Sequence, residues 1–409
     1  MSNANKNPGF RILADGVTVS NDTRVTGLNN NDLIVGPSCA GKTGGYVIPN
    51  IQNISGSMVV SDTKNQLYRK FSAQLKKKGY DVKVIDFVNP HKSCCYNPLS
   101  NIRRYPDGTF REQDVLTLAN SLIRTTAGDK EPIWHMSARS YIAFLICYCL
   151  EELPVKEQNL VSVCELNHAF SNPGGEIAFI DWIDAHPDSF ASRKYREIKA
   201  NKPADKMWAS ILGFANVALE PFEFHESQFI FGAGKSVILR DIGRKKTVLF
   251  LNVSDTDSTF DPMVNIFHTQ VLQCLCSEAD EKEDGRLPVP VRIIMDDFAS
   301  SAKIEDFAKT ISVIRSREIS VSLIIQSLSQ LYSMYGNDAD TIIENCDHHL
   351  ILGTVNRQTA EYVGTRALKT PEKIMCMPGD CAYLLEKGKQ AELVKKIRPY
   401  STLENAWVR

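Results

Sequence analysis

A glycine-bounded loop near the start of the chain constrains the fold more than any other feature. Residues 36–43 read G-x-x-x-x-G-K-[ST], and the apolar residues 32–35 precede them. This order of strand, loop and helix is the setting of a phosphate-binding loop. Glycines at both ends allow backbone N–H groups to point inward as an anion-binding nest, and the following helix adds its positive N-terminal end. The alternative is an ordinary glycine-containing turn.

The residues of this loop have expected roles. The ammonium group of Lys42 can reach the β- and γ-phosphates of a nucleotide, and the hydroxyl group of Thr43 can ligate Mg²⁺. We expect the nucleotide to be bound by one continuous segment: Gly36, Pro37, Ser38, Cys39, Ala40, Gly41, Lys42, Thr43 and Gly44.

A pair of acidic residues lies far downstream, at the end of an apolar run. Residues 291–295 are apolar apart from Arg292 and lead directly into Asp296 and Asp297. Nucleotide hydrolysis needs an acid at the end of a buried strand to hold Mg²⁺, and often a second group to orient the attacking water. We therefore expect Asp296 on the magnesium side and Asp297 as the base or water-positioning residue. The alternative is that both aspartates merely begin a loop or cap a helix.

Two further polar residues are candidates for the same site. Gln326 follows the apolar run 321–325, and an amide at the tip of a strand can sense the γ-phosphate or orient water. A simple polar cap on a buried strand is the alternative for Gln326. Arg315 ends a helix expected over 304–315, where a cation complements the helix dipole. The sharper hypothesis is that Arg315 reaches the nucleotide of a neighbouring subunit as an arginine finger.

The composition is that of an ordinary globular protein. The chain has 409 residues, of which 43% are hydrophobic and 23% are charged, so two domains are expected. The formal net charge of -1 provides no global basic field, so any contact with DNA is local or is created by assembly. The 11 cysteines include no C-x-x-C pair, which argues against a zinc site. An odd number of cysteines without a secretion signal indicates reduced thiols in the cytosol.

Membrane-spanning segments are not expected in this chain. No stretch approaches the roughly 20 apolar residues that cross a bilayer. The most apolar segment, residues 141–150, stops at Glu151 and Glu152 and is typical of a buried core helix. The opening residues Met1 to Ala4 resemble a remnant of an expression vector, so the natural N-terminus is expected to differ.

The order of patterns along the chain predicts the fold class. Apolar runs at 57–62 and 82–87 flank an amphipathic helix over 65–78, and this order predicts parallel strands. We expect further strands at 17–19, 23–25, 247–253, 320–325 and 349–352, and helices at 113–124, 138–152, 160–170, 177–185 and 207–219. The predicted fold is α/β, with a mostly parallel sheet in a nucleotide-binding domain formed by residues 1–110 and 227–409. An all-α domain over 111–226 interrupts it.

Taken together, these residues resemble a known family. The loop 36–43, the stretch 57–64 and the run Tyr96 to Leu99 are similar to the coupling-protein ATPases of conjugative type IV secretion systems, the TraG/TraD-like family. The resemblance covers about residues 30–400 and is weakest across the helical insertion. Further matching stretches are 296–299, 314–317, 320–331, 345–347 and 359–362.

That resemblance implies a RecA-like P-loop domain with ATP and Mg²⁺ as cofactors, and a homohexamer with nucleotide at the subunit interfaces. It implies delivery of relaxase-bound DNA, single- or double-stranded, to secretion-channel proteins at the cytoplasmic face of the bacterial cell membrane. Family members usually carry N-terminal transmembrane helices; without them this chain is expected to be soluble, and a monomer is then an alternative. Local cations could face DNA in a central pore of the assembly, although solvated surface side chains are the commoner explanation for them: Arg240, Arg244, Lys245, Lys246, Lys303 and Lys309.

Two departures from the family pattern affect the expected activity. The family usually has Asp-Glu where this chain has Asp296 and Asp297, so the second carboxylate is one methylene shorter and the hydrolysis rate is in doubt. Cys39 occupies a loop position where a small hydroxyl residue or glycine is commoner, which makes the loop a candidate for thiol sensitivity. Two other functions stay open: an FtsK-like pump for double-stranded DNA, and a nucleotide-gated receptor for protein substrates with weak or no ATPase activity.

Overall fold

The computed structural model describes residues 9–397, with gaps at 64, 124–131, 173, 201–204, 255, 258 and 299–302. Its internal contacts form two compact units, one of residues 1–84, 239–256 and 271–409, and one of residues 85–238 and 257–270. The second unit is larger than the all-α domain expected over 111–226, so those domain boundaries stay a prediction. The segment Met1 to Ala4, Lys64 and Ala299 lie outside the described residues.

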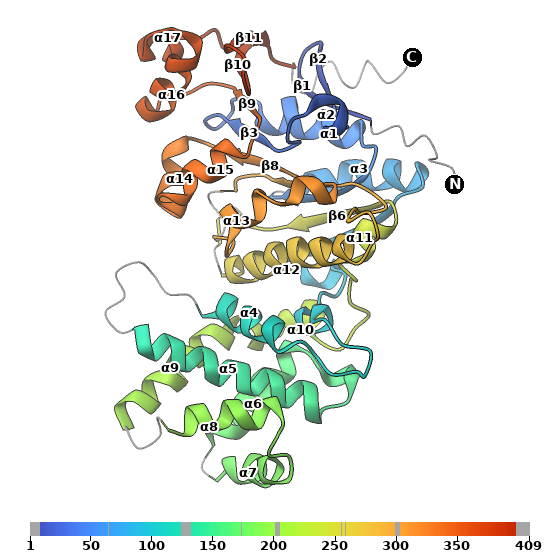
Figure 1. Cartoon of the computed structure of the whole chain (residues 1–409), viewed down its shortest axis with the longest axis vertical. Coiled ribbons are helices and arrows are strands. Elements are labelled where there is room, and N and C mark those ends of the chain that lie inside the picture. Colours follow the sequence, from blue (N-terminus) through green and yellow to red (C-terminus); the bar gives the residue numbers. More distant parts are fainter. Residues whose placement is uncertain are drawn as a thin grey trace. The chain divides into compact units, whose positions relative to one another are not determined.

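A nine-stranded sheet organises the first unit, in the order β11-β10-β9-β3-β8-β7-β4-β6-β5 (Figure 1). Strands β3, β4 and β6 to β9 pair in parallel, whereas β10 and β11 are antiparallel at one edge. The expected α/β class with a mostly parallel sheet is confirmed. The bounds of the strands are β3 Asp32–Val35, β4 Ser57–Asp62, β5 Asp81–Asp86, β6 Thr247–Asn252, β7 Val291–Met295, β8 Ile319–Ile325, β9 His348–Ile351, β10 Cys381–Glu386 and β11 Glu392–Lys395.

The position of β8 determines where the candidate residues meet. It lies between β3 and β7, and its register pairs Val35 with Ile325 and Met295 with Leu323. Because parallel strands end at the same edge of a sheet, the residues that follow β3, β7 and β8 share one edge. This edge therefore carries the start of the P-loop after β3, Asp296 after β7 and Gln326 after β8.

The remaining elements of the first unit surround the sheet. The hairpin of β1 and β2 comes first, and α3 buries Leu67, Phe71 and Leu75 on one face, as the helical spacing predicts. The residues of strand β5 and those of helix α12 are each divided between the two units. The bounds are β1 Phe10–Ala14, β2 Val17–Ser20, α1 Thr23–Thr26, α2 Ile48–Gln52, α3 Gln66–Lys77, α11 Asp241–Arg244, α12 Asp261–Asp280, α13 Phe307–Ile311, α14 Leu328–Tyr335, α15 Asp338–Glu344, α16 Arg357–Ala367 and α17 Pro371–Met375.

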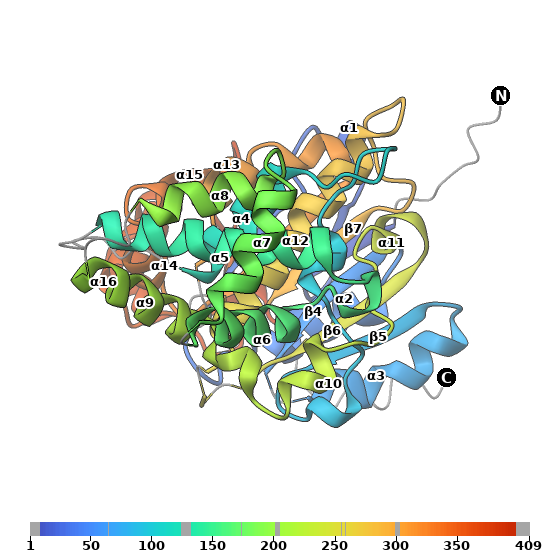
Figure 2. The same cartoon turned by 90° about the horizontal axis from the view of Figure 1, so that it is seen from below.

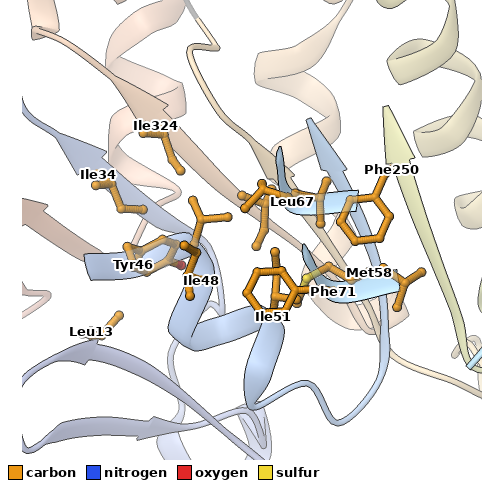
Figure 3. Packing of buried hydrophobic residues seen from close by; sticks show 14 of the residues in the cluster. Leu13, Ile34, Tyr46, Ile48, Ile51, Met58, Leu67, Phe71, Phe250 and Ile324 are labelled. Carbon is orange, nitrogen blue, oxygen red and sulfur yellow. The ribbon is translucent and has the colours of Figure 1, made fainter. Parts of the chain in front are cut away.

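One hydrophobic core supports the P-loop from behind. The helical turn that follows the loop, η1 (Thr43–Val47), continues directly into α2. Figure 3 shows Tyr46 and Ile48 from this segment beside Ile34 of β3 and Ile324 of β8. All four side chains are buried. The segment that carries Lys42 and Thr43 is therefore anchored to the two strands beneath it.

The second unit is a helical bundle built around α5. This helix packs against α4, α6, α8 and α9 (Figure 2). Every residue from Tyr141 to Cys147 is fully buried. By length and composition it could cross a membrane, but 61% of its apolar window is buried, which is typical of the core helix expected here. The bounds are α4 Glu112–Leu122, α5 Pro132–Glu152, α6 Leu160–Ser171, α7 Glu176–Ala185, α8 Phe190–Lys199, α9 Asp205–Glu223 and α10 Ser227–Phe231.

Some expected elements differ from the structure. The strand expected at 23–25 is instead the short helix α1, because Asp22 accepts a hydrogen bond from the Arg24 amide and Gly27 provides a left-handed C-cap. The helix expected over 304–315 consists of α13 and a separate 3₁₀ turn, η5 (Ile314–Arg317). The strand expected at 349–352 is β9, and two strands that the sequence did not predict, β10 and β11, follow it.

Removal of a core ring tests the packing of the sheet. Phe250 on β6 is fully buried, and its ring lies 5.7 Å from that of Tyr68 in an edge-on contact. We expect Phe250→Ala to lower the free energy of unfolding by about 3–5 kcal/mol, because it leaves a cavity. Chemical unfolding followed by circular dichroism measures this loss. Val25→Ala, at a side chain that is 76% exposed, is the control and should change stability by less than about 0.5 kcal/mol. Equal stability of the two variants would contradict the packing.

Candidate functional site

The glycine-bounded loop leaves the sheet at the end of β3. The amide of Gly36 donates to the carbonyl of Ile325, 3.1 Å away, which joins the start of the loop to the tip of β8. Cys39 and Gly41 have left-handed φ angles of 62° and 92°. A Cβ added to Gly41 would meet no atom within 4 Å, so the backbone conformation rather than space favours glycine there.

The ammonium group of Lys42 lies within this loop. It donates to the carbonyl oxygens of Gly36 at 2.8 Å and Pro37 at 3.3 Å, and the residue is only 9% exposed. Both carbonyls belong to the first two residues of the loop. The positive charge is therefore placed where the backbone amides of a P-loop converge on phosphate oxygens.

A hydrogen bond connects the loop to the acidic pair. The hydroxyl group of Thr43 donates to Oδ2 of Asp296 at 3.0 Å, although the two residues are 253 positions apart. Asp296 directly follows β7, so β7 and β3 bring the two side chains together at one edge of the sheet. The backbone amide of Asp297 donates to Oδ1 of Asp296 at 3.1 Å and holds its carboxylate in place.

The charge balance at Asp296 favours a bound cation. Burial raises the pKa of Asp296 to about 6, and the negative charge of Asp297 adds to this rise; the Thr43 hydrogen bond and the charge of Lys42 oppose it. A carboxylate that is ionised with difficulty gains most from a nearby divalent cation. A threonine hydroxyl and carboxylates are also the oxygen ligands that Mg²⁺ prefers. Among the described residues no three His, Cys, Asp or Glu side chains form a metal cluster, and Mg²⁺ commonly uses one or two carboxylates with phosphate and water.

Two of the remaining predicted residues share this edge and one does not. Asp297 is half-buried with a left-handed φ of 51°, and Gln326 is exposed at the tip of β8. Arg315 lies in η5, which precedes β8, and therefore at the opposite edge of the sheet. Its guanidinium donates to the carbonyls of Gly27 at 3.0 Å and Thr23 at 3.4 Å. Arg315 does not meet Lys42 within one chain, so its expected role in trans stays a prediction.

Sequence reasoning missed a buried charge cluster at the other end of β3. Asp32, the first residue of β3, accepts from Arg11 at 3.0 Å, from Arg292 at 3.1 Å and from the Tyr46 hydroxyl at 2.6 Å. Tyr46 and Arg292 also both contact the Ser322 hydroxyl, at 2.8 and 2.9 Å. The signal that could have revealed this cluster was Arg292, the one charge in the apolar run 291–295.

Asp32 is ionised within this cluster. Burial alone would raise its pKa, but the positive charges of Arg11 and Arg292 outweigh burial and lower it. The pKa of the Tyr46 phenol is raised by burial and by the charge of Asp32, so Tyr46 stays a hydrogen-bond donor. Because Tyr46 belongs to the same helical turn as Thr43, the cluster ties that turn to the base of β3.

Sequence comparisons relate the chain to conjugation proteins. The family described as type IV secretory system conjugative DNA transfer matches residues 5–367. Protein VirD4 of Rhizobium radiobacter is 23% identical over 407 residues, which cover 91% of this chain and 57% of that protein. Conjugal transfer protein TraG of Escherichia coli is 22% identical over 362 residues, which cover 81% of this chain and 54% of that protein. The chain thus spans about half the length of the curated relatives it matches.

Solved structures share the fold. The bacterial conjugative coupling protein TrwBdeltaN70 in its unbound form has a TM-score of 0.69 and 15% identity, covering 95% of this chain and 88% of that chain. TrwB in complex with ADP and Mg²⁺ has a TM-score of 0.65 and 15% identity, covering 91% and 86%. VirB4 of Thermoanaerobacter pseudethanolicus has a TM-score of 0.55 and 12% identity, covering 98% and 99%. These similarities confirm the expected RecA-like P-loop NTPase fold.

Removing the charge of Asp32 tests the buried cluster. We expect Asp32→Asn to lower the free energy of unfolding at pH 7 by about 3–5 kcal/mol, because Arg11 and Arg292 would keep their buried charges without a counter-ion. The lowered pKa of Asp32 stabilises the fold above the pKa of an unfolded aspartate, about 4. That stabilisation is lost as the pH falls through the folded pKa.

The deficit of the variant should therefore shrink as the pH falls from 7 to 3. Urea unfolding at a series of pH values measures the difference between the two proteins. Asp340→Asn removes an exposed carboxylate that accepts a hydrogen bond from Tyr332, and it serves as the control with little expected effect. A deficit that does not change with pH would show that Asp32 is not a stabilising charge.

Proposed function

We propose that this chain, which belongs to the family of type IV secretory system conjugative DNA transfer proteins, is a magnesium-dependent ATPase. Its cycle of ATP hydrolysis would drive DNA towards a secretion channel. The observation that carries this proposal is the 3.0 Å contact between Thr43 and Asp296 beside Lys42. These three side chains combine a phosphate-binding cation with the oxygen ligands of a metal ion. The TrwB structure with ADP and Mg²⁺ supports the choice of cofactors.

In this mechanism the loop binds and orients the triphosphate. Its backbone amides and Lys42 would hold the phosphates, while the Thr43 hydroxyl and Asp296 would hold Mg²⁺. The metal ion supplies positive charge that neutralises the phosphoryl group during transfer. Asp296 must release its proton for this role, and the amide of Asp297 keeps its Oδ1 oriented.

Three residues would act on the γ-phosphate. Asp297 lies directly after Asp296 and would orient the attacking water or accept its proton. Gln326 at the tip of β8 lies between the strands that carry Lys42 and Asp296, and it would sense the γ-phosphate. Arg315 of a neighbouring copy would stabilise the charge of the transition state in a homohexamer.

The proposed partners are relaxase-bound DNA and secretion-channel proteins, at the cytoplasmic face of the bacterial membrane. The family match to conjugative DNA transfer and the similarity to conjugal transfer protein TraG support DNA and secretion-system partners. The cations expected to face DNA are not equivalent, because Arg240 and Arg244 pair with the fully buried Glu278. Lys245 pairs with Asp81 and Asp241. Within the described residues Lys246, Lys303 and Lys309 form no ion pair, and they are the better candidates.

Replacement of Asp297 tests the catalytic assignment. We expect Asp297→Asn to lower kcat by about 10²–10⁴-fold with little change in KM, because the amide cannot accept a proton from water. Steady-state ATP hydrolysis with and without single-stranded DNA measures this effect. Lys42→Ala should instead abolish nucleotide binding, and Asp338→Asn on the surface of α15 should leave turnover unchanged. Nucleotide binding by the wild type without turnover would favour the receptor function.

Alkylation of Cys39 provides a second test of nucleotide binding. Cys39 is exposed within the loop, and a maleimide added to it would occupy the space of the phosphates. We expect N-ethylmaleimide to block ATP binding and Mg·ADP to slow the labelling of Cys39 at least about tenfold. Mass spectrometry measures labelling, and the exposed Cys376 is the internal control. Equal labelling of Cys39 with and without Mg·ADP would place the nucleotide elsewhere.

A further inference from the structure

A cavity of about 530 Å³ lies at the edge of the sheet opposite the P-loop, entirely within the first unit. Its lining includes Ser57, Val291 and Ile319, the first residues of β4, β7 and β8. Exposed side chains such as Phe10 and Arg24 also line it, so the cavity is open to solvent. Its volume is in the range of ligand pockets.

The cavity is lined by an excess of basic side chains. Six basic residues line it, against three acidic ones, in a chain whose net charge is -1. Arg286 pairs with Glu318, whereas among the described residues the side chain of Arg24 has no hydrogen-bond or ion-pair partner. Arg315, the expected arginine finger, lines the same cavity.

Arg292 points unused donors into this cavity. The residue is only 8% exposed, and its Nη1 donates to Asp32 and Ser322. Its Nε and Nη2 have no hydrogen-bond partner among the described residues. A buried guanidinium with free donors at the wall of an open cavity is suited to bind an oxyanion, because Arg presents paired N–H groups to phosphate.

We propose that this cavity receives the exposed end of a nucleotide bound by a second copy of the chain, with Arg24 and Arg292 contacting its phosphates beside Arg315. This proposal rests on the proposed function and extends it to further residues of the subunit interface. The P-loop edge of one copy is anionic once nucleotide joins Asp296 and Asp297, whereas the opposite edge is basic. Two edges of opposite charge that pair head to tail form a heterologous contact, and such contacts close into a ring when the rotation between successive copies permits it.

The cavity is physically linked to the P-loop of its own chain. Arg292 and Tyr46 share both of their partners, Asp32 and Ser322. Tyr46 lies in η1, the helical turn that begins at Thr43. A phosphate that draws Arg292 towards the cavity would weaken the hydrogen bonds of Arg292 to Asp32 and Ser322. Because Tyr46 bonds to the same two residues, this change would alter the position of Tyr46 and of the P-loop that precedes it. Occupation of the cavity by a neighbour's nucleotide therefore alters nucleotide affinity in the same copy, and the coupling is reciprocal.

A complementation experiment tests the interface. Lys42→Ala removes nucleotide binding but leaves the cavity intact, and Arg24→Gln alters the cavity but leaves the P-loop intact. We expect Arg24→Gln alone to lower ATP turnover at least about tenfold. An equal mixture of the two variants should recover about a quarter of the wild-type rate, because that share of random contacts joins an intact loop to an intact cavity.

The outcomes separate this proposal from the proposed function. A wild-type chain without turnover would refute the proposed function itself. The proposed role of the cavity would be refuted if the wild-type chain turns over ATP but the mixture gives only the sum of the rates of the two separate variants. Arg317→Gln is the matched control, because Arg317 lies in the same turn as Arg315 but pairs with Asp280 and does not line the cavity. Weaker binding of single-stranded DNA by Arg24→Gln, with normal DNA-free turnover, would assign the cavity to DNA and also overturn the proposal.

A second measurement tests the link through Tyr46. Tyr46→Phe removes the hydroxyl that contacts Asp32 and Ser322 but keeps the buried ring. We expect the dependence of turnover on ATP concentration to lose its cooperativity, with the Hill coefficient falling to about one. Tyr332→Phe removes another hydrogen bond from tyrosine to aspartate, to Asp340 on the surface, and should keep the wild-type coefficient. An unchanged coefficient in Tyr46→Phe would show that Tyr46 only stabilises the fold.

Discussion

The hydrogen bond from Thr43 to Asp296 is the constraint on which the functional reading of this chain depends. It joins two motifs that are 253 residues apart, and it exists because β8 inserts between β3 and β7 in a parallel sheet. The residues that follow β3 and β7 meet because both strands run parallel and are separated only by β8. The raised pKa of Asp296 follows from the same placement, because the carboxyl group is buried there and the negative charge of the adjacent Asp297 adds to the rise.

The two ends of β3 perform different physical tasks. At its carboxyl end the chain forms the P-loop, and at its amino end Asp32 holds two guanidinium groups in the interior. Breaking a buried charge pair is costly, whereas making one contributes little to net stability. We therefore infer that the main role of the cluster is to fix the position of η1, and that its net contribution to the stability of the fold is small. Tyr46 is the member that transmits this position to Thr43.

Local patterns predicted the motifs and the sheet, but not the contacts that depend on tertiary structure. The sequence was enough to predict three features: the P-loop, the strand before Asp296 and the buried face of α3. Each of them is encoded by consecutive residues or by apolar residues at helical spacing. The strand expected at 23–25 became a helix because a capping aspartate and a glycine outweighed β-branched residues. The cluster around Asp32 could not be predicted from the sequence, because Arg11 and Arg292 are far apart in the chain and only the fold brings them together.

A structure of the chain with Mg²⁺ and a non-hydrolysable ATP analogue tests most directly whether Thr43, Asp296 and Lys42 form one nucleotide-binding site. We expect the metal ion to lie about 2.1 Å from the Thr43 hydroxyl, with the Asp296 carboxylate bound to it directly or through one water and the Lys42 ammonium on the phosphates. A metal ion and triphosphate held by other residues, with Thr43 and Asp296 still bonded to each other, would contradict this expectation.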